Sequence, residues 1–146
     1  MKQNVLLSLG VAALAFSVLT GCKTEGCTDP TAVNYESTAD INDGSCNYEG
    51  EVVFWYNAAA SQDVIDFYGE SLLFYVDGQL IGSTAASVYW TGAPDCGQNA
   101  SITYTGTWQN NTSKTVSYEV WDEDGYQWWS GTITLNANNC TALQLL

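Results

Sequence analysis

The sequence predicts an all-β fold: an immunoglobulin-like antiparallel β-sandwich of about seven to eight strands, preceded by a small disulfide-stapled module. Three observations predict it. From residue 51 onward, apolar and polar side chains alternate in short runs, as in half-buried strands. Asp-Gly pairs, which favour tight hairpin turns, separate several of these runs. The 146 residues include 6 Trp, 9 Tyr, 4 Phe and 13 Gly, a composition typical of β-rich proteins with tight turns.

The strand pattern is clearest in residues 101–108, 114–121 and 129–135, which each place their apolar side chains on one face. Residues 51–56 and 72–76 are apolar on both faces, so we expect them to be central strands. Leu143 and Leu145 indicate a last strand.

The turns agree with this pattern. Asp77-Gly78 and Asp124-Gly125 are each expected to join two strands, because glycine accepts positive φ at little steric cost. Asn110-Asn111-Thr112 predicts a third turn. Only residues 61–68 have a helical pattern, with Ser61 as the cap, and a long loop fits them nearly as well.

Residues 1–21 have the parts of a secretory signal peptide, with Lys2, an apolar run and small residues before the cleavage point. The stretch Leu19-Thr20-Gly21-Cys22 resembles the lipobox of bacterial lipoproteins. The resemblance implies that Cys22 receives a diacylglycerol and further acylation such as palmitate, and becomes the first mature residue. An uncleaved membrane helix is one alternative, although the apolar run of about 15 residues is shorter than the roughly 20 needed to span a bilayer. An ordinary signal peptide without lipidation is the other.

Residues 22–26 then form the lipid anchor and a short linker. Four linker residues reach at most about 15 Å, so the protein is expected to lie close to its membrane. The expected location is the bacterial cell envelope at the outer membrane, on its periplasmic or surface face.

The net charge of −13 excludes some functions. A chain this acidic is repelled by phosphate backbones, so nucleic acid is not an expected partner. The sequence contains no histidine, which removes the commonest general base and the commonest metal ligand.

Lipidation of one cysteine leaves four, an even number that suits an oxidising, exported setting. Three pairings are possible. Cys27–Cys46 and Cys96–Cys140 are favoured, because each pair lies within one apparent structural unit. A zinc site is a weak alternative, since the chain has neither a Cys-x-x-Cys pair nor a histidine.

Residues 27–48 carry the pattern C-T-D-P-x-A-x-N-Y followed by D-G-S-C-x-Y. This pattern resembles a short repeat of exported Bacteroidetes proteins. Val33 stands where many copies carry another cysteine, and Asn42 replaces the first Asp of a D-D-G-S-C run. The first departure fits a module with one bridge, and the second weakens any metal site.

The same module suggests a calcium hypothesis. Calcium takes six to eight hard oxygen ligands. Five side chains here carry suitable oxygens: Asp29, Asn34, Asp40, Asn42 and Asp43. The alternative is plain turn chemistry, because Asp-Pro and Asp-Gly pairs are turn formers and the spacing is not that of an EF-hand.

Residues 50–146 resemble small sandwich domains of Bacteroidetes lipoproteins, which begin G-x-V-x-F-W and end W-S-G-T-I-T-V before a cysteine and an apolar strand. Residues 74–82 also resemble the hairpin of PEGA-type domains. These resemblances imply a fold more than an activity.

The strongest candidate for a binding site is the stretch 121–129, where Trp121, Tyr126 and Trp128 lie near three carboxylates. Exposed Trp and Tyr rings with nearby carboxylates suit a sugar site. The alternative is that these rings belong to the core and that the acids solvate a turn. Tyr89 and Trp90 form a second candidate platform with the same alternative.

Catalysis is not expected. Without histidine no Ser–His or Cys–His pair is possible, and one small sandwich offers little cleft for a two-carboxylate glycosidase. The sequence therefore predicts a non-catalytic, lipid-anchored cell-envelope protein that acts in binding, adhesion or assembly, with a protein or glycan partner and no cofactor beyond possible calcium. The alternative is a carbohydrate-binding module that uses exposed Trp and Tyr.

Overall fold

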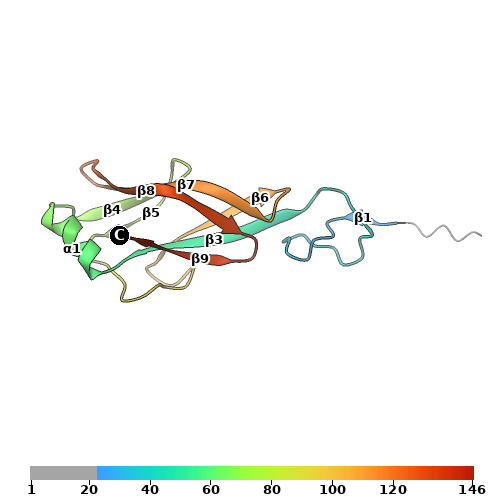
Figure 1. Cartoon of the computed structure of the whole chain (residues 1–146), viewed down its shortest axis with the longest axis horizontal. Helices are drawn as coiled ribbons and strands as arrows, with labels where there is room; N and C mark the ends of the chain where they lie inside the picture. Colours follow the sequence, from blue (N-terminus) through green and yellow to red (C-terminus); the bar gives the residue numbers. More distant parts are fainter. Residues whose placement is uncertain (1–22) are drawn as a thin grey trace, which may run out of the picture.

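The computed structural model describes residues 23–146 (Figure 1). The predicted signal peptide and the predicted lipidation at Cys22 lie outside the described residues. The described chain is mostly β, with antiparallel sheets, one short helix and two disulfides, and its sheets do not close into a barrel. The all-β prediction is confirmed.

Seven strands make up the main body. They are β3 (Asn47–Tyr56), β4 (Ser71–Val76), β5 (Gln79–Ala85), β6 (Ile102–Gln109), β7 (Ser113–Asp122), β8 (Gln127–Asn136) and β9 (Cys140–Leu145). One sheet has the order β6-β3-β9, and the other has the order β5-β4-β7-β8. All neighbours are antiparallel except β3 and β9, which pair in parallel.

This strand order differs from the immunoglobulin-like order expected from the sequence. An immunoglobulin domain places its first, second, fifth and fourth strands in one sheet and its third, sixth and seventh in the other. Here the first, fourth and seventh strands (β3, β6 and β9) share one sheet, and the other four share the second. Alternation and turns identify strands and hairpins, but they do not say which distant strand a given strand pairs with.

One hydrophobic core lies between the two sheets. Its buried members come from both sheets, the helix and the residue after β5: Val52, Phe54, Tyr56, Ala60, Val64, Leu72, Phe74, Val76, Ala86, Val116, Val120, Leu135 and Leu145. The rings of Phe54 and Phe74 meet across the sheets with their centroids 5.9 Å apart. The side chains predicted to share one face of β6, β7 and β8 all pack against this core, as expected.

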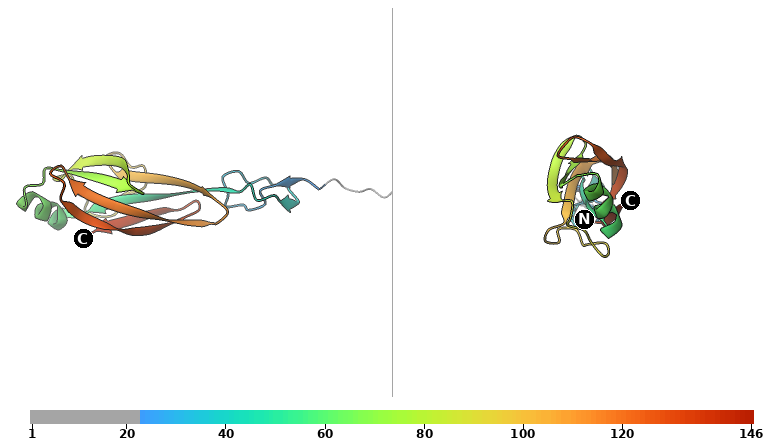
Figure 2. Two further views of the ribbon diagram at one scale, coloured as in Figure 1. Left: turned by 90° about the horizontal axis from the view of Figure 1, so that it is seen from above. Right: turned by 90° about the vertical axis from the view of Figure 1, so that its left-hand side faces the viewer.

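The two strands predicted to be central are central. Strand β3 lies between β6 and β9, and β4 lies between β5 and β7. On β3 the residue Val53, which alternates with the core residues, is also fully buried. The segment of residues 86–101 runs along this side of the molecule (Figures 1 and 2). It is held there by the Cys96–Cys140 disulfide and by a hydrogen bond from the Trp90 N–H to the Tyr56 carbonyl of 3.0 Å.

The predicted turns are found. Asp77 and Gly78 both have positive φ, 48° and 76°, and form the two-residue turn between β4 and β5. Asn110, with φ 74°, lies in the turn between β6 and β7. Gly125, with φ 85°, lies in the loop between β7 and β8.

The helix α1 (Ala58–Asp66) begins earlier than the sequence pattern predicts. Its N-cap is Asn57, whose side chain accepts a 3.0 Å hydrogen bond from the Ala60 N–H, so the prediction of Ser61 as the cap is wrong. Ser61 is buried inside the helix, and its hydroxyl donates to the Ala86 carbonyl at 2.7 Å. The helix lies at the end of the molecule opposite the stapled module (Figures 1 and 2).

The stapled module has little regular structure. Two-residue strands β1 (Glu25–Gly26) and β2 (Ile41–Asn42) pair in parallel. A small buried cluster holds it together: Cys27, Ala32, Cys46 and Tyr48, with Trp108 of β6 packed against it. Because β3 begins at Asn47, the module continues directly into the main body without a separate linker.

Both predicted disulfides are confirmed. Cys27 is bonded to Cys46, and Cys96 is bonded to Cys140. The first closes the module, and the second ties the 86–101 segment to β9.

Removing each disulfide should lower the free energy of unfolding. Replacing Cys96 and Cys140 by alanine is expected to cost about 4 kcal/mol, because the bridge closes a long loop in the unfolded chain. The same change at Cys27 and Cys46 is expected to cost about 3 kcal/mol, because that loop is shorter. The sequence separations are 44 and 19. Urea denaturation of the two double variants measures both values, and unchanged stability in either would contradict the expectation.

Candidate functional site

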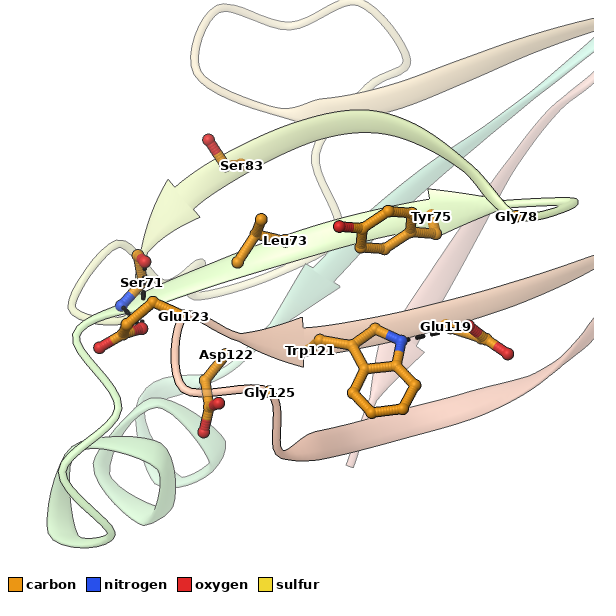
Figure 3. A pocket seen from close by; sticks show the side chains of 10 residues that line it. All are labelled: Ser71, Leu73, Tyr75, Gly78, Ser83, Glu119, Trp121, Asp122, Glu123 and Gly125. Carbon is orange, nitrogen blue, oxygen red and sulfur yellow. Dashed lines mark hydrogen bonds between the residues drawn. The ribbon is translucent and has the colours of Figure 1, made fainter.

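The outward face of the four-stranded sheet carries a groove of about 630 Å³, called here the outer groove (Figure 3). Strands β4, β5 and β7 supply most of its lining, and the loop after β7 supplies the rest. The lining residues are Ser71, Leu73, Tyr75, Gly78, Ser83, Glu119, Trp121, Asp122, Glu123 and Gly125. A groove of this size falls in the range of ligand sites.

The floor of the outer groove is built from two cross-strand pairs. Leu73 of β4 lies opposite Trp121 of β7, and Tyr75 lies opposite Glu119. The Trp121 indole N–H donates a 3.1 Å hydrogen bond to the Glu119 carboxylate, which fixes both side chains on this face. On the other side of β4, Ser83 of β5 lies opposite Leu73.

These floor residues are unusual for their position. Strands with one face on the core normally carry polar side chains outward. On β4 the buried residues Leu72, Phe74 and Val76 alternate with Leu73 and Tyr75, which are half-buried and point away from the core. Unlike the outward face of β3, this face keeps an open groove over its apolar side chains. An open apolar floor framed by polar groups is the usual construction of a binding site.

Glu123 closes one end of the outer groove. Its carboxylate accepts hydrogen bonds from the backbone N–H groups of Glu70 and Ser71, both at 2.8 Å, and from the Ser71 hydroxyl at 3.1 Å. Figure 3 shows Glu123 against Ser71. Together with the N–H of Glu123 itself, which has the largest effect, these donors lower the pKa of Glu123 to about 2. The carboxylate therefore stays ionised and ties the loop after β7 to the start of β4.

Asp77 fixes the opposite end of the same strand pair. Its carboxylate accepts hydrogen bonds from the Ser117 N–H at 2.9 Å and the Ser117 hydroxyl at 3.2 Å. Lys114 lies 3.9 Å from the other carboxylate oxygen of Asp77. Two carboxylates therefore hold the pairing of β4 with β7 at its two ends.

The other aromatic candidates of the stretch 121–129 lie outside the outer groove. Asp122 is buried, and its carboxylate accepts hydrogen bonds from the Tyr126 N–H at 2.7 Å and the Trp128 indole at 3.1 Å. It points away from Leu73 and Tyr75 in Figure 3. The Trp128 ring contacts Tyr126 and Phe67 edge-on and packs against the core. For Trp128, the interpretation as a packed ring therefore fits the structure better than a free sugar platform.

Tyr89 and Trp90 lie on the 86–101 segment, beside the other sheet. Tyr89 is about half exposed, at 49%, while Trp90 is partly buried and bonded through its backbone to Tyr56. Neither residue lines the outer groove. Of the five predicted ligand-binding residues, the structure places only Trp121 in this groove.

Sequence reasoning missed most of the groove. Leu73, Tyr75 and Ser83 belong to strands that it identified, but it read residues 72–76 only as a central strand. The apolar side chains on both faces of residues 72–76 were the available signal. When both faces of a strand are apolar, the second face is covered by another part of the protein or by a ligand.

The side-chain oxygens of the five candidate calcium ligands each accept hydrogen bonds within residues 24–48. Among residues 23–146 no three acidic or cysteine side chains form a group that could hold a metal ion. The oxygens instead serve separate turns: Asp29 accepts from Thr31 and Tyr48, Asn34 from Asn47, Asp40 from Thr24, Asn42 from Gly44, and Asp43 from Ser45. The Thr31 and Ser45 donors lower the pKa of Asp29 and Asp43 respectively. Turn chemistry accounts for the hydrogen bonds of these residues, and the calcium site stays a prediction.

No protein-family model, curated protein or solved structure matches this chain. Within the described part of the chain, no helix has the length and apolar character needed to cross a membrane. The candidate site therefore rests on its own geometry.

Replacing Glu123 by glutamine should remove a pH-dependent part of the stability. The folded state lowers the pKa of Glu123 from its ordinary 4.5 to about 2. The contribution of the carboxylate is therefore fully present above about pH 4.5 and is lost as the pH falls toward 2. In urea denaturation, the free energy of unfolding should fall more from pH 7 to pH 3 in the wild type than in Glu123→Gln.

The matched control is Glu49→Gln, which removes an exposed carboxylate of β3, away from this contact. It should follow the wild type at both pH values. If the free energy of unfolding fell by the same amount from pH 7 to pH 3 in the wild type and in Glu123→Gln, the assigned role of Glu123 would be contradicted.

Proposed function

We propose that the protein is a non-catalytic, lipid-anchored binding protein of a bacterial cell envelope, and that the outer groove is its binding site. The observation that carries the proposal is the floor of Leu73, Tyr75 and Trp121, which leaves apolar and aromatic surface open on the outward face of a central strand pair. The chain has no histidine, so it cannot form the Ser–His or Cys–His pairs that activate many enzyme nucleophiles.

The shape of the molecule supports a role at a membrane. The stapled module follows the proposed lipid site at Cys22 by a few residues and lies at one end of an elongated body (Figure 2). The Glu123 end of the outer groove lies beside the helix, toward the opposite end (Figures 1 and 3). An anchor at Cys22 would thus hold the groove away from the lipid surface, where a partner can reach it.

The finer fold class belongs to the same proposal. We interpret the main body as a two-layer β-sandwich of seven strands, and residues 27–48 as an appended spacer module. The separate buried clusters of the module and the main body support this division. The proposed kinship with Bacteroidetes lipoproteins rests on the sequence patterns of both parts.

A second candidate function is carbohydrate binding. The observation that favours it is the Trp121 ring beside Tyr75 and Glu119, since sugar sites combine aromatic faces with carboxylate acceptors. We favour a protein partner, because Tyr126 and Trp128 pack against neighbouring rings and do not extend this platform.

Replacing Trp121 by alanine should abolish binding while keeping the fold. The ring lies outside the buried core, so the expected loss of stability is about 1 kcal/mol, as for an ordinary substitution. The purified wild type and variant would be tested on a peptide array and on a panel of polysaccharides, with a melting curve for each protein. We expect peptides, and not polysaccharides, to be retained by the wild type alone.

Tyr89→Ala is the matched control, because Tyr89 is an exposed ring outside the outer groove. It should bind as the wild type does. Binding that survives Trp121→Ala, or that is lost equally in Tyr89→Ala, would contradict the groove as the binding site.

Replacing Cys22 by serine tests the anchor. The variant lacks the thiol that receives the diacylglycerol, so it should leave the membrane fraction when cells are fractionated. Retention of Cys22→Ser in the membrane at the wild-type level would contradict lipid anchoring.

A further inference from the structure

The outer groove holds negative charge that the protein does not neutralise. Glu119 lies on its floor, and Glu123 lies at its end. The described chain contains two lysines, Lys23 and Lys114, and no arginine. The single ion pair among residues 23–146 joins Lys114 to Asp77. Within these residues, no lysine therefore forms an ion pair with Glu119 or Glu123.

The two carboxylates differ in what they can still accept. Glu123 is occupied by three donors from Glu70 and Ser71, so it acts mainly through its charge. Glu119 is exposed, and one of its oxygens accepts the Trp121 indole N–H at 3.1 Å. No described group donates to its second oxygen. Glu119 thus offers a carboxylate oxygen held in place and open to a ligand.

The aromatic floor favours a cation as well. The Trp121 indole donates a hydrogen bond to the Glu119 carboxylate, and Tyr75 is the cross-strand neighbour of Glu119. The face of an indole or phenol ring attracts a cation within about 6 Å, and arginine is the side chain most often found there. A guanidinium can stack on a ring and donate to a carboxylate at the same time.

We infer that the outer groove binds a protein segment that carries an arginine, with the guanidinium between Trp121 and Glu119. This inference rests on the proposed binding function and names its partner class. The groove of about 630 Å³ is larger than one side chain, and Leu73 offers apolar contact to the residues beside the arginine. The serine hydroxyls of Ser71 and Ser83 lie along the same groove for polar contacts.

The test compares two capped peptides made of three Arg-Leu repeats and three citrulline-Leu repeats. Citrulline keeps the shape of arginine and lacks its charge. In isothermal titration calorimetry, the purified protein should bind the arginine peptide roughly tenfold more tightly than the citrulline peptide. The reason is that citrulline cannot form charge-assisted hydrogen bonds with a carboxylate. Added salt should narrow this difference.

Two protein variants distinguish binding at the outer groove from attraction by the overall negative charge of the protein. Glu119→Gln should weaken binding of the arginine peptide by roughly tenfold, because it removes the open carboxylate. Glu49→Gln makes the same change of charge on β3, in the other sheet, and should change the affinity less than about twofold.

Three results would overturn the inference: equal affinity for the two peptides, equal losses in Glu119→Gln and Glu49→Gln, or no binding of the arginine peptide at millimolar concentration. Failure of the inference and failure of the proposed function are distinguishable. If neutral peptides or polysaccharides bind in a manner that requires Trp121, the binding function stands and the arginine assignment fails. If nothing binds through Trp121, both fail.

Discussion

The pairing of β4 with β7 is the constraint on which the candidate site depends. The paired residues lie more than forty positions apart in the chain, so no turn joins the two strands directly. Their register is held at one end by Glu123, which accepts two backbone N–H groups at the start of β4, and at the other by Asp77, which accepts from Ser117. A slip of one residue between the two strands would place Leu73 and Trp121 on opposite faces of the sheet. The side chains that fix the strands therefore also fix the binding surface.

The two central strands show how one sequence property has two structural outcomes. Residues 52–56 of β3 and 72–76 of β4 are apolar on both faces. The second face of β3 is buried at Val53, and the 86–101 segment with its disulfide lies on that side of the molecule. On β4 the second face keeps a groove, and its half-buried side chains remain within reach of a partner. This contrast is why we assign function to one outward face and stability to the other.

The sequence predicts the local parts of this fold well. Apolar patterns and turn signals together locate the seven main strands, and Asp77-Gly78 locates a two-residue turn. The placement of each cysteine pair within one structural unit leads to the correct disulfides. It does not predict the sheet order, because long-range pairing depends on contacts such as Glu123 with the β4 backbone that no local pattern encodes.

The site was predicted only in part for the same reason. Trp121 stands out in the sequence, but Tyr75 and Glu119 join it only when the register of β4 and β7 is known. Trp128 is equally prominent in the sequence. In the structure it packs against the core, and its indole N–H donates a hydrogen bond to the buried Asp122. Composition identifies aromatic side chains, whereas burial decides which of them a ligand can reach.

The central claim is that ligands meet the protein at Trp121 in the outer groove. Nuclear magnetic resonance of protein labelled with ¹⁵N at its 6 tryptophans resolves one indole N–H signal for each ring. Titration with the arginine–leucine peptide should shift the signal of Trp121, assigned by its loss in Trp121→Phe, more than any other. The largest shift at Trp90 or Trp128, or no shift at Trp121 when the peptide is bound, would contradict the account.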